Sequence, residues 1–230
     1  MGASQTIFEN RHDAGRRLAE ELRGYSGQFV VVLAIPNGGV PVALEVASAL
    51  KADLDLIISR KIPISFNPEG GIGAAADDGT VILNEEAVRR IGLSQQQIEY
   101  EANKVRAEIK QRSLLYKGDR LPVRVNGRTV IIIDDGLASG FTMMAAVESV
   151  RRRQPKEVVV AVPVASAMAV KHVEKVADKV VTCYTSFMPK FYISDFYKHW
   201  HDLSDDDVVR YLKEWRTQQF RSHLMPPQDR

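Results

Sequence analysis

The chain has 230 residues, of which 45% are hydrophobic and 26% are charged. This length suits one domain with a smaller appendage, and we expect residues 1–230 to form a single domain. The composition is ordinary for a globular protein and excludes a chain that is disordered throughout. The formal net charge is only +2, so neither a nucleic acid nor an anionic membrane is expected as a partner.

The sequence carries no feature that is typical of a secreted or membrane-spanning protein. No apolar run approaches the roughly 18–20 residues of a membrane span, and the N-terminal segment is charged, unlike a signal peptide. The single cysteine, Cys183, excludes an internal disulfide and a cysteine-based metal site. Because it lies in a strand-like run, we expect it to be a small buried hydrophobe. These observations predict a cytoplasmic protein.

Five short apolar runs predict the strands of a sheet. They are rich in valine, isoleucine and leucine, and most do not alternate with polar residues, as is typical of strands buried on both faces. They cover residues 29–35, 54–58, 129–133, 158–164 and 179–184. Helical patterns at 42–50, 143–153 and 165–176 follow three of them. The alternation predicts an α/β fold with a doubly wound, mainly parallel sheet and helices on both faces.

Two stretches lie outside this alternation. Residues 84–117 are charged and rich in glutamine, and they predict a helical insertion of two helices outside the sheet. Residues 186–221 begin with aromatic side chains and predict a C-terminal hood. A helix is expected to begin at Ser204, because three aspartates follow in its first turn, where acidic groups favour the helix dipole.

The segment from Val130 to Thr142 carries the chemistry. Four apolar residues are followed by two acids, Asp134 and Asp135, then by a turn of small residues and the start of a helix. In open α/β sheets, ligands bind beyond the carboxyl ends of the strands. Backbone N–H groups of the turn and the helix N-terminus suit a phosphate. The two acids suit the hydroxyls of a sugar, or a metal ion.

This segment resembles the signature of the type I phosphoribosyltransferases, and its one mild departure is Gly136. The resemblance implies that Asp134 and Asp135 hold the ribose 2′ and 3′ hydroxyls of phosphoribosyl pyrophosphate. It also implies that the following loop binds the 5′-phosphate. That loop consists of Leu137, Ala138, Ser139, Gly140, Phe141 and Thr142.

Two further elements resemble the pyrophosphate site of that family. Asn37, Gly38 and Gly39 follow the first strand, where the family binds pyrophosphate through backbone groups, often beside a non-proline cis peptide. That bond corresponds to the one between Pro36 and Asn37. Many members have a basic residue at the position of Asn37, so this chain lacks one positive charge there. Arg60 and Lys61 resemble a third element, in which a basic residue approaches the pyrophosphate, and we expect Lys61 to act in catalysis.

The whole chain resembles a narrower group: stand-alone predicted phosphoribosyltransferases of bacteria and archaea with no established acceptor. The shared segments include residues 12–18, 67–69, 72–74, 81–84, 116–118 and 191–192. The resemblance implies transfer of the phosphoribosyl group to a nitrogen acceptor, such as a nucleobase, with release of pyrophosphate. It also implies a homodimer. Magnesium (Mg2+) is the expected cofactor, bound by substrate oxygens and water, with Asp134 and Asp135 reaching it at most through water.

The acceptor is less well defined than the donor. In 6-oxopurine members a carboxylate within the phosphate loop acts on the base, but that position is Ala138 here. Lys190, Phe191 and Tyr192 are the candidates for acceptor binding, although packing for the C-terminal helix explains the two rings equally well. Residues 62–80, which are rich in glycine, are the candidate lid over the site.

Other interpretations of the same residues stay open or are disfavoured. A phosphoribosyl pyrophosphate- or nucleotide-binding regulator without turnover would keep the same pocket. A receiver-like domain phosphorylated on Asp134 is disfavoured, because an aspartyl nucleophile does not need a separate phosphate loop. The glycines of 71–76 do not join a strand to a helix, which argues against a dinucleotide site. His199 and His201 are two residues apart and have no third metal ligand in view.

Overall fold

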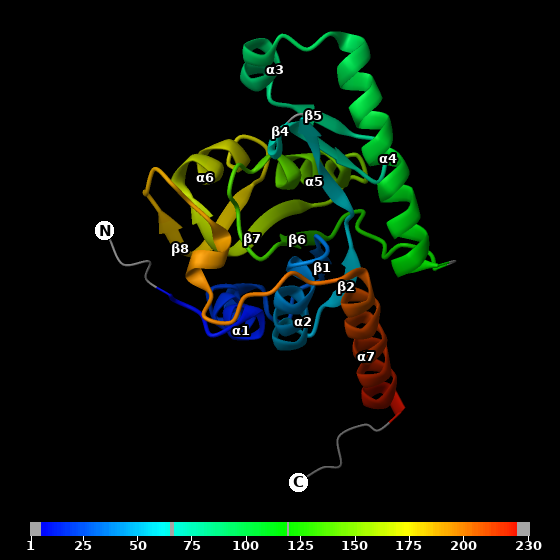
Figure 1. Ribbon diagram of the computed structural model, residues 1–230. Coiled ribbons are helices and arrows are strands. Elements are labelled where there is room, and N and C mark those ends of the chain that lie inside the picture. The colour runs from blue at the N-terminus through cyan, green and yellow to red at the C-terminus, as the bar shows by residue number, and fades with distance from the viewer. Residues whose placement is uncertain (1–5, 65–66, 119, 225–230) are drawn as a thin grey trace.

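The main sheet has five parallel strands in the order β2-β1-β6-β7-β8 (Figure 1). The computed structural model describes residues 6–64, 67–118 and 120–224. The strands are β1 (Val30–Ala34), β2 (Asp53–Leu56), β6 (Thr129–Ile133), β7 (Glu157–Ser166) and β8 (Lys179–Ser186). Ala34 pairs with Leu56 on one side and with Ile133 on the other. The carboxyl ends of β2, β1 and β6 are therefore level and open at the same edge.

Helices cover both faces of this sheet, which confirms the predicted doubly wound α/β fold. Helices α1 (Arg11–Glu21) and α2 (Gly39–Leu50) lie on one face, and α5 (Phe141–Arg151) and α6 (Ala167–Val173) lie on the other (Figure 1). Successive side chains of β1 point to opposite faces. Val32 accordingly packs in the same core as Val46 of α2, whereas Leu33 packs in the same core as Val147 of α5.

Some predicted boundaries were wrong. Strand β7 continues to Ser166, so the helix predicted at 165–176 is shorter and covers only α6. The reason is a cap: the Ser166 side chain accepts the N–H of Ala169 and fixes the start of α6. Helix α1 had no predicted counterpart. Its N-cap Asn10 accepts the N–H of Asp13 in the same way.

A second, antiparallel sheet consists of β3 (Ser59–Ile64), β4 (Asn67–Ala76) and β5 (Val81–Leu83). The apolar run at 54–58 predicted the second strand, but β2 ends at Leu56, and Ser59, Arg60 and Lys61 begin β3 in this other sheet. Ile62 and Ile72 are fully buried, so the sheet packs firmly on the core. The candidate lid at 62–80 falls within it, apart from residues 65 and 66, which lie outside the described residues. Its closing movement stays a prediction.

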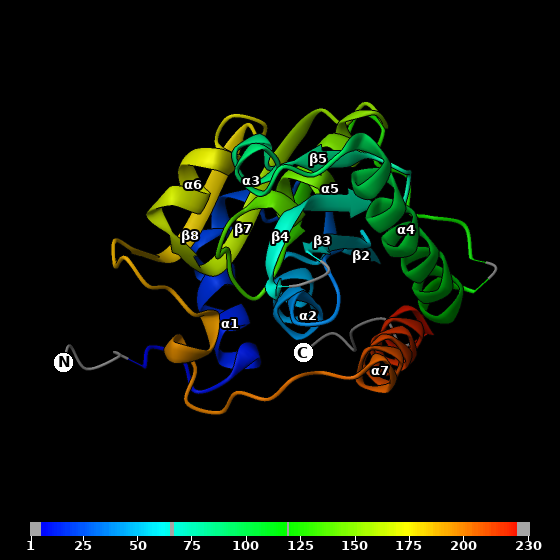
Figure 2. The same cartoon turned by 45° about the horizontal axis from the view of Figure 1, so that its top comes forward.

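The insertion and the tail form the helices that the sequence predicted. Helices α3 (Glu85–Ile91) and α4 (Gln95–Lys117) follow β5, and Ser94 and Gln97 form a capping box at the start of α4. The short 3-10 segment η2 (Ile193–Phe196) precedes α7 (Asp205–Leu224). The C-terminal end of α4 and the first part of α7 lie side by side (Figures 1 and 2). This pair of helices flanks the open edge of the main sheet.

In the described ranges, no helix is both long enough and apolar enough to pass through a membrane. Cys183 on β8 is half-buried and packs against two hydrophobic clusters. Burial raises the pKa of its thiol to about 12, so the thiol stays protonated near neutral pH. This agrees with the packing role expected for Cys183.

Candidate active site

A cavity of about 780 Å³ opens at the carboxyl ends of β1 and β6, and we call it the strand-end cavity. It brings together residues of the two predicted ligand loops, β3, α4 and the C-terminal segment. Its charged lining residues are Arg11, Arg60, Lys61, Glu108, Arg112, Asp134, Asp135 and Asp202. The predicted site residues Asn37, Gly38 and Thr142 also line it. Residues predicted from separate motifs therefore meet at one place.

Asp134 and Asp135 follow β6 and face this cavity. The backbone N–H of Asp135 donates to Oδ1 of Asp134 at 2.8 Å. Burial, and next the charge of Asp135, raise the pKa of Asp134 well above its usual range. Burial also raises the pKa of Asp135, although the nearby Arg11 guanidinium acts against it. Hydroxyl donors or a cation in the cavity would stabilise the ionised form of these two carboxyl groups.

Arg11 from α1 holds Asp135 in place. Its Nε lies 2.8 Å from Oδ2 of Asp135, and both side chains are almost fully buried. Its Nη1 donates to the carbonyl of His201 at 2.9 Å, and the guanidinium stacks 3.8 Å from the centre of the Trp200 ring. The hydroxyl of Tyr197 donates to the backbone carbonyl of Asp135 at 2.6 Å. The acid pair is thus fixed by residues from both ends of the chain.

The first half of the predicted phosphate loop is hydrogen-bonded to β7. Leu137 is buried, and its N–H donates to the carbonyl of Val164 at 2.9 Å. The Ser166 hydroxyl donates to the carbonyl of Ala138 at 2.8 Å. Ala138 and Ser139 are exposed. Leu137 therefore packs in the core beside β7, whereas Ala138 and Ser139 lie on the surface of the protein.

The second half of the loop begins α5. Gly140 is the N-cap and has a φ of +86°, a conformation that side chains rarely adopt. Phe141 is the first helical residue, and Thr142 lines the cavity. The carbonyl of Thr142 accepts the Ser59 hydroxyl at 2.8 Å, which ties the second sheet to this loop. The helix N-terminus therefore faces the strand-end cavity, as an anion site requires.

The predicted pyrophosphate loop lies directly beside the acid pair. The peptide bond between Pro36 and Asn37 is cis, as the family resemblance implies. A Cβ atom on Gly38 would overlap the carboxylate of Asp135, and one on Gly39 would lie 2.6 Å from the carbonyl oxygen of Ile133. Both positions therefore need glycine, because the loop packs against the end of β6.

A network from α4 and α7 surrounds Asn37. Nη1 of Arg112 donates to Oδ1 of Asn37 at 3.0 Å, and Nη2 lies 3.2 Å from Oδ1 of Asp205. The Tyr116 hydroxyl donates to Asp205 at 2.6 Å, and the Asn37 amide donates to the carbonyl of Leu203. Burial acts to raise the pKa of Asp205, but hydrogen bonds from Tyr116 and from the Asn37 amide at 3.1 Å, together with the Arg112 charge, outweigh it and hold the pKa below its usual range. Arg112 thus brings a positive charge to the loop position where the sequence lacks one.

Arg60 and Lys61 reach the cavity from β3. Arg60 lies 3.3 Å from a carboxylate oxygen of Glu108 on α4. Lys61 is exposed, and its stem lies across Gly71, where an added Cβ would stand 2.7 Å from the Lys61 Cγ. Both cations therefore border the same space as the acid pair, on the side of the second sheet.

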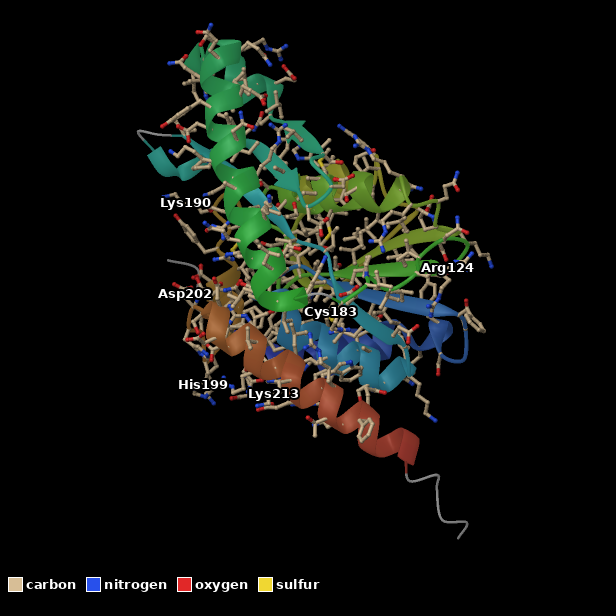
Figure 3. The ribbon with its side chains drawn as sticks, turned by 90° about the vertical axis from the view of Figure 1, so that its right-hand side faces the viewer. Arg124, Cys183, Lys190, His199, Asp202 and Lys213 are labelled. Atoms are coloured by element: carbon tan, nitrogen blue, oxygen red, sulfur yellow. The ribbon has the colours of Figure 1, made fainter. Side chains whose placement is uncertain are left out.

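The hood contributes different residues from those predicted. Its lining residues are Ile193, Trp200, Asp202 and Leu203. Lys190, Phe191 and Tyr192 are not among the residues that line the cavity. Lys190 (Figure 3) and Tyr192 are exposed, and the Phe191 ring lies 5.2 Å from the ring of Phe196. Their role in acceptor binding stays a prediction.

The family model described as "Phosphoribosyl transferase domain" matches residues 4–193. The chain belongs to this family. Two curated Mycobacterium tuberculosis proteins, from strains CDC 1551 and H37Rv, are named as predicted phosphoribosyl transferases. Each is 38% identical to this phosphoribosyltransferase domain over 206 residues. The match covers 90% of this chain and 46% of each relative, so the chain spans about half the length of the curated relatives it matches.

A solved structure shows the same fold. The crystal structure of TT1426 from Thermus thermophilus has a TM-score of 0.74 and 36% sequence identity to this phosphoribosyltransferase domain. The match covers 91% of this chain and 99% of that one. The α/β fold predicted from the sequence is therefore confirmed, and the family model confirms the phosphoribosyltransferase family that the resemblance implied.

The acid pair also suits the magnesium that the family implies. Within the described residues, no group of three or more His, Cys, Asp or Glu side chains is placed to hold a metal ion. Magnesium does not need such a group, because it commonly keeps several waters and takes one or two carboxylates plus phosphate oxygens. Burial and the charge of Asp135 raise the pKa of Asp134 and so disfavour its ionised form. A nearby cation would stabilise that ionised form.

Proposed function

We propose that the protein transfers the phosphoribosyl group of phosphoribosyl pyrophosphate to a nitrogen atom of an acceptor and releases pyrophosphate. The acceptor would be a nucleobase or a related heterocycle. One observation carries the proposal: Asp134 and Asp135 lie against the loop at 37–39 and lead into the loop at 137–142, and residues of all three line one cavity. Membership of the phosphoribosyltransferase family supports it.

These parts correspond to the successive groups of the donor substrate. The N-terminus of α5 and the loop at 137–142 would take the 5′-phosphate through backbone N–H groups. The half-buried Asp134 would accept hydrogen bonds from the ribose hydroxyls. Asp135, which is held by Arg11, would fix the position of the pair. The loop at 37–39 would take the pyrophosphate. Fixing both ends of the sugar orients its C1 atom for attack.

In the reaction the bond between C1 and the pyrophosphate oxygen breaks, and a bond between C1 and the acceptor nitrogen forms. Pyrophosphate leaves with the electron pair, and the acceptor nitrogen loses its proton. Positive charge develops on the sugar ring, and negative charge develops on the leaving group. Lys61, Arg60 and Arg112 border the place where the leaving group would lie. Their charges would stabilise it more in the transition state than in the ground state.

Magnesium would supply a further positive charge on the pyrophosphate when bound. Asp134 and Asp135 are the carboxylates placed to hold it, through water. The acceptor would lie toward Ile193 and Trp200, two of the apolar hood residues that line the cavity. Ala138 offers no carboxylate to a base, which argues against a 6-oxopurine enzyme of the commoner pattern.

The direct test measures pyrophosphate release. The protein is incubated with phosphoribosyl pyrophosphate, magnesium and a panel of purines, pyrimidines and related heterocycles, and a reaction without acceptor measures hydrolysis. We expect one or more acceptors to raise release above hydrolysis. Donor binding without release under any acceptor would instead favour a regulator that senses the ligand. The homodimer and the cytoplasmic location stay predictions, which sedimentation and cell fractionation test.

A further inference from the structure

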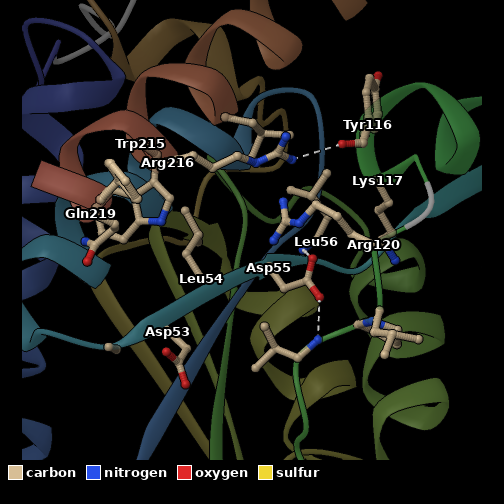
Figure 4. A pocket seen from close by; sticks show the side chains of 16 residues that line it. Asp53, Leu54, Asp55, Leu56, Tyr116, Lys117, Arg120, Trp215, Arg216 and Gln219 are labelled. Carbon is tan, nitrogen blue, oxygen red and sulfur yellow. Dashed lines mark hydrogen bonds between the residues drawn. The ribbon is translucent and has the colours of Figure 1, made fainter. Parts of the chain in front are cut away.

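A second cavity lies at the C-terminal end of α4, and we call it the α4–α7 cavity. It has a volume of about 420 Å³ and lies between β2, the segment that follows α4, and α7 (Figure 4). This volume is within the range of small-molecule sites, roughly 300–1,000 Å³. None of the residues predicted for phosphoribosyl pyrophosphate line it. The proposed transfer reaction therefore gives this cavity no role.

Two arginines meet in this cavity. Arg216 reaches in from α7 and Arg120 from the segment after α4, and Figure 4 shows their guanidinium groups approaching each other. Nη2 of Arg216 donates to the carbonyl of Tyr116 at 3.2 Å. Partial burial, and next the charge of Arg120, lower the pKa of Arg216. Across the described residues, neither guanidinium forms an ion pair with a carboxylate.

The two acids that line this cavity are already engaged. Asp55 of β2 is buried at the base of the cavity. Its Oδ1 accepts the N–H of Leu56 at 2.8 Å, and its Oδ2 accepts the N–H of Val123 at 2.9 Å. Asp53 at the rim pairs with Arg128 at 2.7 Å. Two facing guanidinium groups against one buried carboxylate leave a net positive charge, which an incoming anion would neutralise.

Apart from Lys117, which pairs with Asp77 at 2.8 Å, and Gln219, the rest of the lining is mostly apolar and partly open to solvent. Leu54 and Leu56 form a buried wall, and Trp215 is half-buried beside them. Leu121 is 89% exposed and Phe220 is 67% exposed at the rim. A flat apolar ligand would remove these side chains from water, and an aromatic ring could stack on the Trp215 indole.

We propose that the α4–α7 cavity binds a small aromatic anion, a planar ring system that carries one phosphate or carboxylate group. The anionic group lies between Arg120 and Arg216, and the ring lies against Trp215 and the leucines of β2. The two arginines favour an anionic group, and the apolar walls favour an aromatic ring. Inorganic phosphate alone meets only the first requirement and binds more weakly.

The same helices link this cavity to the strand-end cavity. Tyr116 presents its backbone carbonyl to Arg216, while its hydroxyl contacts Asn37 and Asp205. A ligand that bridges Arg120 and Arg216 therefore joins the segment after α4 to α7, next to the network that holds Asn37. The binding proposal itself does not depend on the transfer reaction.

The two tryptophans of the chain make the test specific. Trp200 lines the strand-end cavity and Trp215 lines the α4–α7 cavity. The variant Trp200→Phe leaves Trp215 as the single indole, so its fluorescence reports on the α4–α7 cavity. The full chain is titrated with AMP, with its neutral counterpart adenosine, with benzoate and with inorganic phosphate. Arg120→Met and Arg216→Met are then made in this background, with Arg210→Met, an exposed arginine of α7 outside the cavity, as the matched control.

We expect AMP or benzoate to change the fluorescence saturably, with adenosine and inorganic phosphate at least tenfold weaker. A preference for AMP identifies a phosphate ester, and a preference for benzoate identifies a carboxylate. Arg120→Met and Arg216→Met should each weaken binding at least tenfold, and Arg210→Met should not. Arg120 is exposed, so its variant tests the proposal even if Arg216→Met fails to fold. No saturable change, equal binding of adenosine and AMP, or wild-type affinity in Arg120→Met would overturn the proposal.

Discussion

The buried ion pair between Arg11 and Asp135 supports a quantitative prediction. The two side chains are 7% and 11% exposed, so water cannot replace the guanidinium. Removing one partner of a buried ion pair typically costs about 3–5 kcal/mol, because the other charge is left uncompensated. Arg11→Met keeps an unbranched side chain in this space. We expect it to lower the free energy of unfolding by about 3–5 kcal/mol at pH 8.

The pH dependence of this loss separates charge from packing. Burial raises the pKa of Asp135 and Arg11 limits the rise, so the pKa rises further when Arg11 is removed. The folded variant then keeps a proton that the unfolded chain releases above about pH 4. Its stability therefore falls, relative to wild type, as the pH rises. The loss should be smallest near pH 5 and largest near pH 8.

The assay is urea unfolding followed by circular dichroism at both pH values. The double variant Arg11→Met with Asp135→Asn should recover most of the loss, because no buried charge is left unpaired. Arg17→Met is the control, since Arg17 is on the same helix, its side chain is 52% exposed, and it pairs with Asp13 at 3.3 Å. This variant should cost under about 1 kcal/mol. A loss under about 1 kcal/mol for Arg11→Met, or an equal loss at pH 5 and pH 8, would refute the reasoning.

Three further outcomes are expected. Arg112→Met should weaken binding of magnesium pyrophosphate about ten- to hundredfold in calorimetry, since a charge-assisted hydrogen bond contributes about 1.5–3 kcal/mol; unchanged affinity would show that Arg112 does not face the ligand. Asp134→Asn should stabilise the fold near pH 8 and lose this advantage near pH 4, because burial and Asp135 raise the pKa of Asp134 and its ionisation therefore costs stability as the pH rises; unfolding curves with the opposite trend would contradict this. Gly38→Ala should lower both donor affinity and melting temperature, since its Cβ would overlap Asp135, whereas Gly24→Ala meets nothing within 4 Å and serves as the control; equal melting temperatures would refute the proposed close approach.

Local patterns predicted the main sheet and the position of the acid pair. Strands β1 and β6 at the centre of the sheet are buried on both faces, so each appears in the sequence as a continuous apolar run. The segment from Val130 to Thr142 is contiguous, and its strand, acids, turn and helix keep the same order in the structure. The two helices of the insertion were also predictable, because Ser94 and Gln97 give a local start signal.

The residues that complete the cavity come from distant parts of the chain. Arg11 is 124 residues from Asp135, and Arg112 is 75 residues from Asn37. No spacing rule connects residues at such separations, so only the folded chain shows that they meet. The second sheet was missed for another reason: β3 and β4 contain proline and several glycines, which indicate turns more strongly than strands.

Calorimetric binding of phosphoribosyl pyrophosphate with magnesium tests the central claim most directly. Wild type is compared with Asp134→Asn plus Asp135→Asn, and with Glu85→Gln plus Glu86→Gln, which neutralises two adjacent exposed carboxylates on α3. We predict that wild type and the α3 variant bind the donor alike, and that the Asp134 and Asp135 variant binds it at least about a hundredfold more weakly, a difference of about 2.7 kcal/mol. Wild-type affinity in the Asp134 and Asp135 variant would contradict the assignment of this cavity as the donor site.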